Sequence, residues 1–325
     1  MRHLSSGMRK ACAAFALAAA LAAGAPASAV ELPCGTAKLI VPWGAGGDTD
    51  IVNRIVADAV NADGMSPGLQ VVNVPGQGGN KGAKEALAAK PDGCTLVAIH
   101  QSAISSYFTG RVDFTWQAFE PVALMVRTPP IVGARPDAPY SDLKGLIAAA
   151  KAAPGTVLAG ATLGSTSHFW LLLLEDAAGI SLKYVPYEGT RERMTALLAK
   201  NIDLGELNLA AAKQYLTSNE LKALAIYTEA RNPELPDVMT AKEQGVDLTA
   251  GTDRGVMAPE GTPDAAIAFW ADRFEAVAKK PEIVEAFAAK GSLIVFKRGA
   301  DYQAYMDETL AKWEAVAKKV GIYNR

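Results

Sequence analysis

Apolar and polar positions alternate between two kinds of segment from about residue 38 onwards. Short runs of Val, Ile and Leu without polar alternation are typical of strands that are buried on both faces. Longer segments with apolar residues at helical spacing lie between these runs, and short turns rich in Gly, Pro and Asp join them. The pattern predicts an α/β fold with doubly wound sheets.

The predicted elements can be placed along the chain by these signals. Strands are expected at 38–42, 70–74, 95–99, 121–126, 131–134, 156–161, 183–186, 202–207 and 223–226. Helices are expected at 49–60, 80–90, 102–107, 141–152, 167–178, 190–199, 209–216, 240–244, 264–279 and 301–319. Thr262 is the expected N-cap of the helix at 264–279, with Pro263 at its first position. The helix at 301–319 has apolar residues at helical spacing and is expected to pack on the body.

Two segments interrupt the series where the chain is expected to cross between domains. They are Thr128-Pro129-Pro130 and residues 247–251. Two crossings would place both chain ends in one domain and the middle of the chain in another. We therefore expect domain I at 30–126 and 253–325, and domain II at 127–252.

The first 29 residues have the composition of an export signal. Arg2, Arg9 and Lys10 precede an apolar run at 11–23, and Ala27-Ser28-Ala29 fits a small-residue cleavage site. The apolar run is too short to span a membrane, and no later segment approaches that length. We expect cleavage after Ala29, leaving a soluble, exported chain of 296 residues.

Composition narrows the classes of partner. Half of the residues are hydrophobic, so the chain can bury a sizeable core. Loss of the three basic residues of the leader leaves 29 Lys and Arg against 34 Asp and Glu, a formal net charge of −5. No basic cluster with interleaved aromatic residues occurs, so we expect no nucleic-acid partner.

Cys34 and Cys94 remain after removal of the leader. Each stands at the start of a predicted strand, and in a doubly wound sheet of order 2-1-3 these strands are parallel neighbours. An oxidising compartment would then favour a disulfide between them. Two unrelated buried thiols are the alternative.

Two glycine-rich turns, far apart in sequence, each join a predicted strand to a predicted helix. They are residues 44–50 and residues 160–168. Such a turn exposes the free N–H groups of the helix start, where the helix dipole favours an anion. Two such helix starts that face one another would hold a small carboxylate from both sides.

Seven motifs in register resemble the substrate-binding proteins of tripartite tricarboxylate transporters, also called Bug proteins. The first, at 42–50, resembles P-x-x-[AG]-G-G-x-x-D, and the segment at 73–82 is similar to N-x-P-G-x-G-G-x-x-G. The others are Pro91-Asp92-Gly93-Cys94-Thr95-Leu96, Gly164-Ser165-Thr166-Ser167-His168, Val185-Pro186-Tyr187-Glu188-Gly189, Leu235-Pro236-Asp237-Val238 and Ala258-Pro259-Glu260-Gly261-Thr262-Pro263.

The resemblance implies a two-domain, periplasmic-binding-protein-like clamshell. Such a protein closes on a small organic acid, a di- or tricarboxylate or related acid, and hands it to membrane permease subunits. We expect a monomer in the periplasm that binds without catalysis, so we expect no catalytic residues, no cofactor and no metal. A periplasmic sensing subunit that presents the ligand to a signalling partner is the alternative.

The resemblance and the two turns together give a set of candidate site residues. The predicted ligand-binding residues are Trp43, Gly44, Ala45, Gly46, Gly47, Thr49, Asp50, Ser102, Gly164, Ser165, Thr166, Ser167, His168, Tyr187, Asn208 and Arg254. Asp50 can equally cap its helix, because a carboxylate beside a bound anion would repel it. Arg254 can form a bidentate pair with a ligand carboxylate.

Several features leave alternatives open or exclude a class. Glu206 departs from the Asp-Asn pattern of many members, although Asn208 can still contribute an amide to the cleft. Arg191 and Arg193 begin a predicted helix; solvent exposure is the default for both, although one can face the cleft. The turn at 76–82 fails the dinucleotide pattern, because Lys81 stands where the third glycine belongs. No G-x-S-x-G elbow accompanies Ser167 and His168, which argues against a hydrolase.

Overall fold

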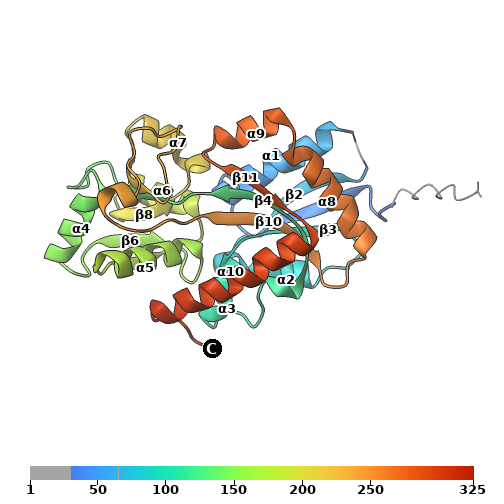
Figure 1. The fold of residues 1–325 in the computed structure, drawn as a ribbon, viewed down its shortest axis with the longest axis horizontal. Coiled ribbons are helices and arrows are strands. Elements are labelled where there is room, and N and C mark those ends of the chain that lie inside the picture. The colour runs from blue at the N-terminus through green and yellow to red at the C-terminus, as the bar shows by residue number, and fades with distance from the viewer. Residues whose placement is uncertain (1–30, 65) are drawn as a thin grey trace, which may run out of the picture. The chain divides into compact units, whose positions relative to one another are not determined.

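The computed structural model describes residues 31–64 and 66–325 (Figure 1). Residues Leu32–Arg325 form one compact unit. The expected export signal and its cleavage after Ala29 lie outside the described residues. Among the described helices, none combines the length and the apolar character needed to cross a membrane.

Eleven strands among the described residues form two sheets. The six-stranded sheet, called sheet A, has the order β11-β4-β10-β3-β1-β2. Its strands are β1 (Thr36–Val41), β2 (Gly68–Asn73), β3 (Thr95–Ile99), β4 (Phe119–Thr128), β10 (Thr252–Pro259) and β11 (Leu293–Lys297). The pairs β1–β2 and β1–β3 are parallel, whereas β10 runs antiparallel to both β3 and β4. Sheet A therefore contains the expected 2-1-3 order.

The five-stranded sheet, called sheet B, has the order β7-β6-β8-β5-β9. Its strands are β5 (Ile131–Ala134), β6 (Leu158–Ala161), β7 (Lys183–Pro186), β8 (Leu204–Leu207) and β9 (Lys222–Ile226). β6 runs parallel to β7 and β8, and β5 runs antiparallel to β8 and β9. Sheet B is thus formed by the middle of the chain, although the domain boundaries at 126/127 and 252/253 stay a prediction.

Helices cover both faces of each sheet, which explains the uninterrupted apolar strands. They are α1 (Asp48–Ala62), α2 (Asn80–Leu87), α3 (Ser102–Phe108), α4 (Leu143–Ala152), α5 (Thr166–Ala178), α6 (Thr190–Leu198), α7 (Leu209–Thr217), α8 (Asp264–Ala278), α9 (Pro281–Ala288) and α10 (Gly299–Lys319). In β1, Leu39 and Val41 pack with residues of α1, α8 and α9, whereas Ile40 faces the core that includes α2, α3 and α10. Burial on both faces removes polar alternation.

Strand β10 and the elements α9 and β11 were not expected from the sequence. All eight residues of β10 are buried, but Asp253 and Arg254 interrupt its apolar pattern. Each of these charges has a partner in the fold, since Asp253 pairs with Arg127 at 2.5 Å and Arg254 pairs with Asp48. The expected cap was also wrong, because Pro263 is the N-cap of α8 and Thr262 Oγ1 instead donates to the Pro259 carbonyl at 2.7 Å.

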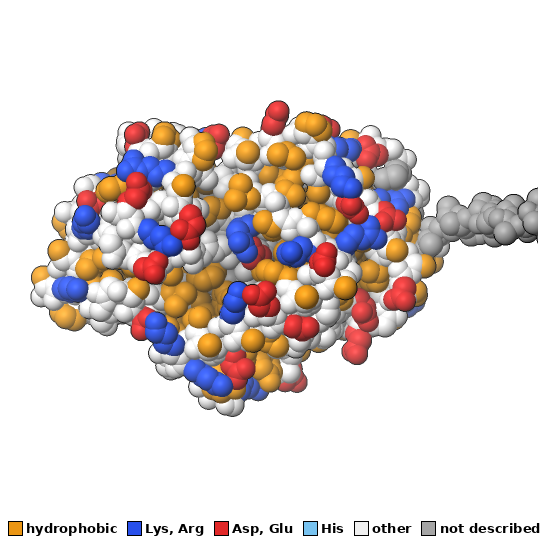
Figure 2. Space-filling view, in the orientation of Figure 1, with side chains coloured by type: hydrophobic (Ala, Val, Ile, Leu, Met, Phe, Trp, Pro, Cys, Tyr) orange, Lys and Arg blue, Asp and Glu red, His pale blue; other side chains and the backbone are white. Residues whose placement is uncertain are grey.

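Two further contacts tie distant segments together. Cys34 and Cys94 form a disulfide at the starting ends of β1 and β3, 60 residues apart in sequence. The tail helix α10 packs on the body, where Trp313 stacks on Phe169 of α5 with ring centroids 4.7 Å apart. On the face shown in Figure 2, side chains of both charges are interspersed rather than gathered into a patch of one sign.

Candidate functional site

A cavity of about 560 Å³ lies among elements of both sheets and is the candidate site. Its volume falls in the range of small-molecule sites, roughly 300–1,000 Å³. The turn after β1, the starts of α5 and α6, the region from β8 to α7 and the start of β10 contribute to its wall. The lining residues used below are Trp43, Gly44, Ala45, Gly47, Asp48, Thr49, His100, Thr162, Ser165, Thr166, Ser167, Tyr187, Glu188, Thr190, Arg191, Glu192, Arg193, Glu206, Asn208, Thr252 and Arg254.

The first glycine-rich turn leads into α1 at the cavity. Gly47 is the N-cap of α1, and its N–H donates to the Gly44 carbonyl at 3.3 Å. Gly46 has a φ of +78°, which side-chain-bearing residues rarely adopt. The turn therefore needs glycine for its backbone conformation, and it brings the amino-terminal end of α1 to the cavity.

Asp50 stabilises this turn from outside the cavity lining. Its Oδ2 accepts the Gly46 N–H at 2.8 Å, and its Oδ1 accepts from Asn73 Nδ2 at 2.8 Å. Arg54 Nη2 completes an ion pair at 2.9 Å. Although burial opposes the change, the hydrogen bonds from Arg54, Gly46 and Asn73 lower the pKa of Asp50. Asp50 is therefore an ionised residue that supports the turn.

The second turn leads into α5 at the same cavity. Ser165 is the N-cap of α5, and Ser167 Oγ accepts the Thr162 N–H at 2.9 Å. His168 Nδ1 accepts the Gly164 N–H at 3.3 Å, and burial, aided by Arg111, lowers the pKa of His168 to about 4. Ser165, Thr166 and Ser167 line the cavity, whereas Gly164 and His168 lie beside it in a neighbouring depression.

The predicted site residues thus divide into two groups. Those in the lining are Trp43, Gly44, Ala45, Gly47, Thr49, Ser165, Thr166, Ser167, Tyr187, Asn208 and Arg254. Those outside it are Gly46, Asp50, Ser102, Gly164 and His168. Ser102 is buried at the start of α3, where its N–H donates to His100 Nδ1 at 3.2 Å. Ligand contact by the first group stays a prediction.

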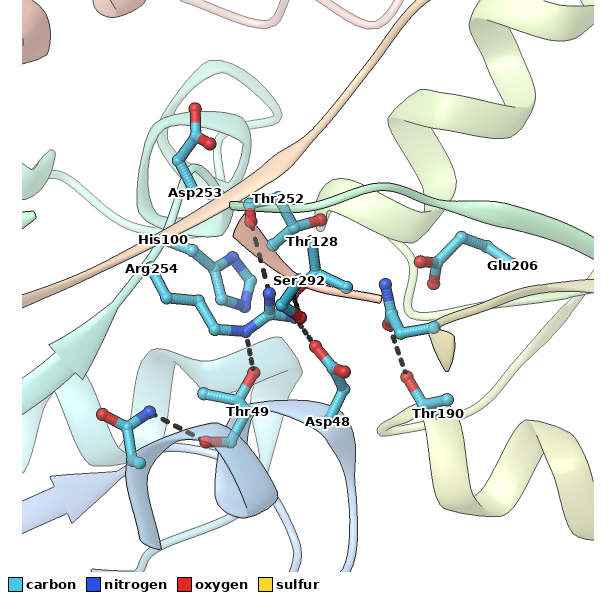
Figure 3. Close-up of polar contacts among 12 residues, drawn as sticks. Asp48, Thr49, His100, Thr128, Thr190, Glu206, Thr252, Asp253, Arg254 and Ser292 are labelled. Carbon is cyan, nitrogen blue, oxygen red and sulfur yellow. Dashed lines mark hydrogen bonds and ion pairs between the residues drawn. The ribbon is translucent and has the colours of Figure 1, made fainter. Parts of the chain in front are cut away.

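Arg254 lines the cavity and is held in place by residues of α1 and β10. Its Nη2 forms an ion pair with Asp48, its Nε donates to Thr49 Oγ1 at 3.1 Å, and its Nη1 donates to the Thr252 carbonyl at 3.2 Å. Figure 3 shows this arrangement, with His100 beside Arg254. Burial raises the pKa of Asp48 and Arg254 opposes that rise. Part of the charge of Arg254 is therefore offset by Asp48.

A second buried ion pair stands on the sheet B side of the cavity. Arg193 Nη2 lies 2.6 Å from Glu206 Oε2, and both side chains are almost fully buried. Arg193 also donates to Thr162 Oγ1 and Thr190 Oγ1, each at 3.1 Å. Burial lowers the pKa of Arg193 and raises that of Glu206. The expected solvent exposure of Arg193 was wrong, because Glu206 provides a buried partner.

Trp43 and His100 form an aromatic wall. Their rings stack with centroids 4.1 Å apart and an interplanar angle of 16°. Burial and the nearby Arg254 lower the pKa of His100 well below its usual value. His100 is therefore neutral, so it adds hydrogen-bonding capacity and a flat surface rather than charge.

Sequence reasoning left several lining residues out of the candidate set: Asp48, His100, Thr162, Thr190, Glu188, Arg191, Glu192, Arg193, Glu206 and Thr252. Asp48 could have been found from the sequence. It lies inside the first motif and places an acid at a helix start that is expected to bind an anion. Thr190 and Thr252 carried no such signal, because a threonine near the end of an element is common in any fold.

Hydrogen bonds also join the two sides at the edge of the cavity. Glu188 Oε2, after β7, accepts the Gly78 N–H at 2.8 Å. Arg191 Nη1, at the start of α6, donates to the Ala45 carbonyl at 3.1 Å. Both contacts connect the segment after β7 of sheet B with sheet A, where Gly78 follows β2 and Ala45 follows β1. They hold the two walls of the cavity together.

Comparisons with known proteins agree on one family. The model of the tripartite tricarboxylate transporter family receptor matches residues 52–322. Protein BugT of Bordetella pertussis is 28% identical over 303 residues, which cover 91% of this chain and 93% of BugT. The structure of periplasmic binding protein BugD aligns with a TM-score of 0.83 at 28% identity, covering 89% of this chain and 99% of BugD. The structure of R. palustris Rpa4515 with adipate aligns with a TM-score of 0.82 at 27% identity. The alignment covers 89% of this chain and 98% of Rpa4515.

Proposed function

The chain belongs to the tripartite tricarboxylate transporter receptor family, and from this premise we propose that it is a periplasmic solute-binding protein. It captures a small organic carboxylate and delivers it to the membrane permease of a tripartite tricarboxylate-type transporter. The family is one of binding proteins, and the similar Rpa4515 structure contains adipate, a dicarboxylate.

The observation that carries this proposal is the meeting of two helix starts at one cavity. The amino-terminal residues of α1 (Asp48 and Thr49) and of α5 (Thr166 and Ser167) all line the cavity. The first N–H groups of a helix have no partner within the helix, and the dipole places partial positive charge there. A carboxylate between the two ends would accept hydrogen bonds from both.

The proposed action is binding and not chemistry. Ser167 Oγ already accepts the Thr162 N–H, and His168 Nδ1 already accepts the Gly164 N–H. No hydrogen bond joins Ser167 to His168 among the described residues, and His168 lies outside the cavity lining, which supports binding over nucleophilic catalysis. The contacts of Glu188 and Arg191 across the cavity edge would instead stabilise a form closed around the ligand.

A thermal-shift and calorimetric screen against mono-, di- and tricarboxylates tests the binding half of the proposal. A ligand at 100 times its dissociation constant stabilises the protein by about 2.7 kcal/mol. Gly44→Leu is expected to weaken binding at least about tenfold, because Gly44 lines the cavity and has open space for a side chain. Gly35→Leu is the matched control, since Gly35 also has open space but lies outside the cavity.

Binding of no carboxylate in the screen would contradict the proposal, as would equal effects of the two glycine substitutions. The transport half is tested by uptake of the identified ligand in cells that lack the gene. Transport predicts loss of uptake with restoration by the wild-type gene. Normal uptake together with a lost transcriptional response to the ligand would favour the sensing alternative.

A further inference from the structure

One segment of the chain connects the two glycine-rich turns of the candidate site. It consists of residues 100–106, which follow β3 and continue into α3. At one end, the ring of His100 stacks on Trp43, the residue directly before the first turn, with ring centroids 4.1 Å apart. At the other end, Ser105 reaches the second turn, where its Oγ donates to the Gly164 carbonyl at 2.8 Å.

The contact of Ser105 with Gly164 is buried and joins elements of different sheets. Ser105 lies in α3, which follows a strand of sheet A, whereas Gly164 follows β6 of sheet B, 59 residues further along the chain. Ser105 is fully buried. Loss of its hydroxyl would therefore leave the Gly164 carbonyl without its nearest donor, in a place where water cannot replace it.

Two neighbouring contacts show that this hydrogen bond is the principal one. Ser105 Oγ also lies 3.1 Å from the Ser102 carbonyl, but a hydroxyl carries one hydrogen and the Gly164 oxygen is the nearer acceptor. Ser106 is fully buried as well, and its Oγ lies 3.4 Å from the same Gly164 oxygen, which is long for a hydrogen bond. Ser106 therefore matches Ser105 in burial and helix but holds Gly164 less firmly.

The Gly164 carbonyl belongs to the peptide unit that leads into α5. This planar unit also contains the N–H of Ser165, the N-cap of α5, which donates to the Thr162 carbonyl at 3.0 Å. The unit is thus held at its oxygen by Ser105 and at its N–H by Thr162. Because it directly precedes the helix, its orientation sets the direction of the first N–H groups of α5, which are the ones that face the cavity.

Close packing around Gly164 also ties the second turn to α3. Gly164 has a φ of +73°, and a Cβ at this position would lie 2.8 Å from Arg111 Cδ and 3.0 Å from Thr109 Oγ1. Thr109 is the C-cap of α3, and Arg111 follows it by two residues. The turn is therefore packed against the end of α3 as well as bonded to its middle.

We propose that Ser105 is a positioning residue for ligand binding, which holds the start of α5 in its place at the cavity through the Gly164 carbonyl. Ser105 lies outside the cavity lining, so its effect on a ligand must pass through the second turn. Two helix starts bind one carboxylate together only while the N–H groups of both point at it, because hydrogen bonds weaken steeply with misalignment. This role rests on the carboxylate-binding function proposed above.

Calorimetry measures the effect of Ser105 on affinity. The probe is the acid that binds the wild-type protein most tightly among succinate, malate, adipate and citrate. Ser105→Ala is expected to weaken its binding about three- to tenfold, whereas the matched control Ser106→Ala should change the affinity less than about twofold. Ser105→Cys keeps a weak S–H donor, so its affinity should lie between those of the wild-type protein and Ser105→Ala.

Hydrogen exchange of the ligand-free proteins, followed by NMR, separates positioning from a purely structural role. The amides of Ser165, His168 and Phe169 are hydrogen-bonded within the turn and the first part of α5, so they report the order of this helix start. Ser105→Ala is expected to raise their exchange rates at least about threefold while the second half of α5 exchanges as in the wild-type protein. A purely structural role would instead lower the free energy of unfolding and leave the affinity of the folded protein unchanged.

The outcomes separate the two proposals. Wild-type affinity in Ser105→Ala, or equal losses in Ser105→Ala and Ser106→Ala, overturns this inference and leaves the carboxylate-binding function standing. Unchanged exchange at the three reporting amides also overturns it. If Ser105→Ala does not fold, Ser105→Cys is compared with Ser106→Ala in both measurements, and the same two results decide. Failure of all four acids and of the wider carboxylate screen to bind the wild-type protein overturns the proposed function and the role of Ser105 in binding together.

Discussion

Arg193 and Glu206 form a buried ion pair with 2.6 Å between Nη2 and Oε2, directly beside the candidate ligand cavity. Removal of one partner of a buried pair leaves an uncompensated charge, which typically destabilises a protein by about 3–5 kcal/mol. Arg193→Met and Glu206→Gln are each expected to lower the free energy of unfolding. The loss should be larger for Arg193→Met, because this change also removes the hydrogen bonds to Thr162 and Thr190. Urea unfolding of the two single variants and the double variant measures this.

The double variant is the internal control for that pair. Its loss of stability is expected to be smaller than the sum of the two single losses, because neither charge is left alone. Strict additivity would contradict a direct interaction between the two side chains.

Gly255 in β10 leaves room for Tyr302 of α10. A Cβ at residue 255 would lie 1.9 Å from Tyr302 Oη and 3.0 Å from the Ala123 carbonyl. Gly255→Ala is therefore expected to destabilise the protein by about 1–3 kcal/mol. Tyr302→Phe alone is expected to be close to neutral, because the buried hydroxyl has no hydrogen-bond partner among the described residues.

The combination of Gly255→Ala with Tyr302→Phe tests the cause of the loss. Removal of Oη relieves the shortest contact, so the melting temperature of the double variant should lie above that of Gly255→Ala. A double variant that is less stable than both single variants would show that the close approach is not the reason for glycine at this position.

His168 should contribute to the loss of stability in acid. Burial, aided by Arg111, lowers the pKa of His168 to about 4 in the folded protein, below its ordinary value of 6.5. As the pH falls, the unfolded chain therefore binds the proton first. The stability that depends on a neutral His168 is fully present above about pH 6.5 and is lost as the pH falls towards about 4. Within that window the slope from this residue approaches about 1.4 kcal/mol per pH unit.

Urea midpoints of the wild-type protein and of His168→Gln between about pH 4.5 and about pH 7.5 check this contribution. The variant should show a shallower dependence on pH in this window, whereas the carboxylates and His100 titrate alike in both proteins. Parallel curves would mean that the pKa of His168 is the same in the folded and the unfolded protein.

The hydrogen bonds at the cavity edge should strengthen ligand binding without contact to the ligand. Glu188→Ala removes the acceptor of the Gly78 N–H, and Arg191→Ala removes the donor to the Ala45 carbonyl. Each change should weaken binding by a factor of about 2–10, since a typical intramolecular hydrogen bond contributes about 0.5–1.5 kcal/mol. Calorimetry with the ligand found in the carboxylate screen measures the loss.

Glu220→Ala is a suitable control for these two variants, because Glu220 is exposed and bonds only to the neighbouring Ser218 among the described residues. The dissociation rate should rise in Glu188→Ala and Arg191→Ala, because the closed form loses support. An unchanged affinity in both variants would mean that these contacts do not hold the liganded form closed.

Local patterns were sufficient for the fold class. In β1 and β3, the consecutive positions 39–41 and 96–99 are buried by helices on both faces, so each run is apolar and is visible in the sequence. The predicted α/β fold and the Bug-type family were confirmed by the match of residues 52–322 and by the solved relatives. Strand β10 could not be recognised, because its Asp253 and Arg254 find their partners only in the folded chain.

The sequence by itself determined the two glycine-rich turns and the helices that follow them, because steric freedom at Gly46 and the start of a helix are local properties. Only the tertiary structure decided which residues share the cavity. It buried Arg193 against Glu206, placed Asp48 against Arg254 and left Asp50 to support the turn. Charge pairing between residues distant in sequence depends on the packing of separate elements, and no local pattern contains that information.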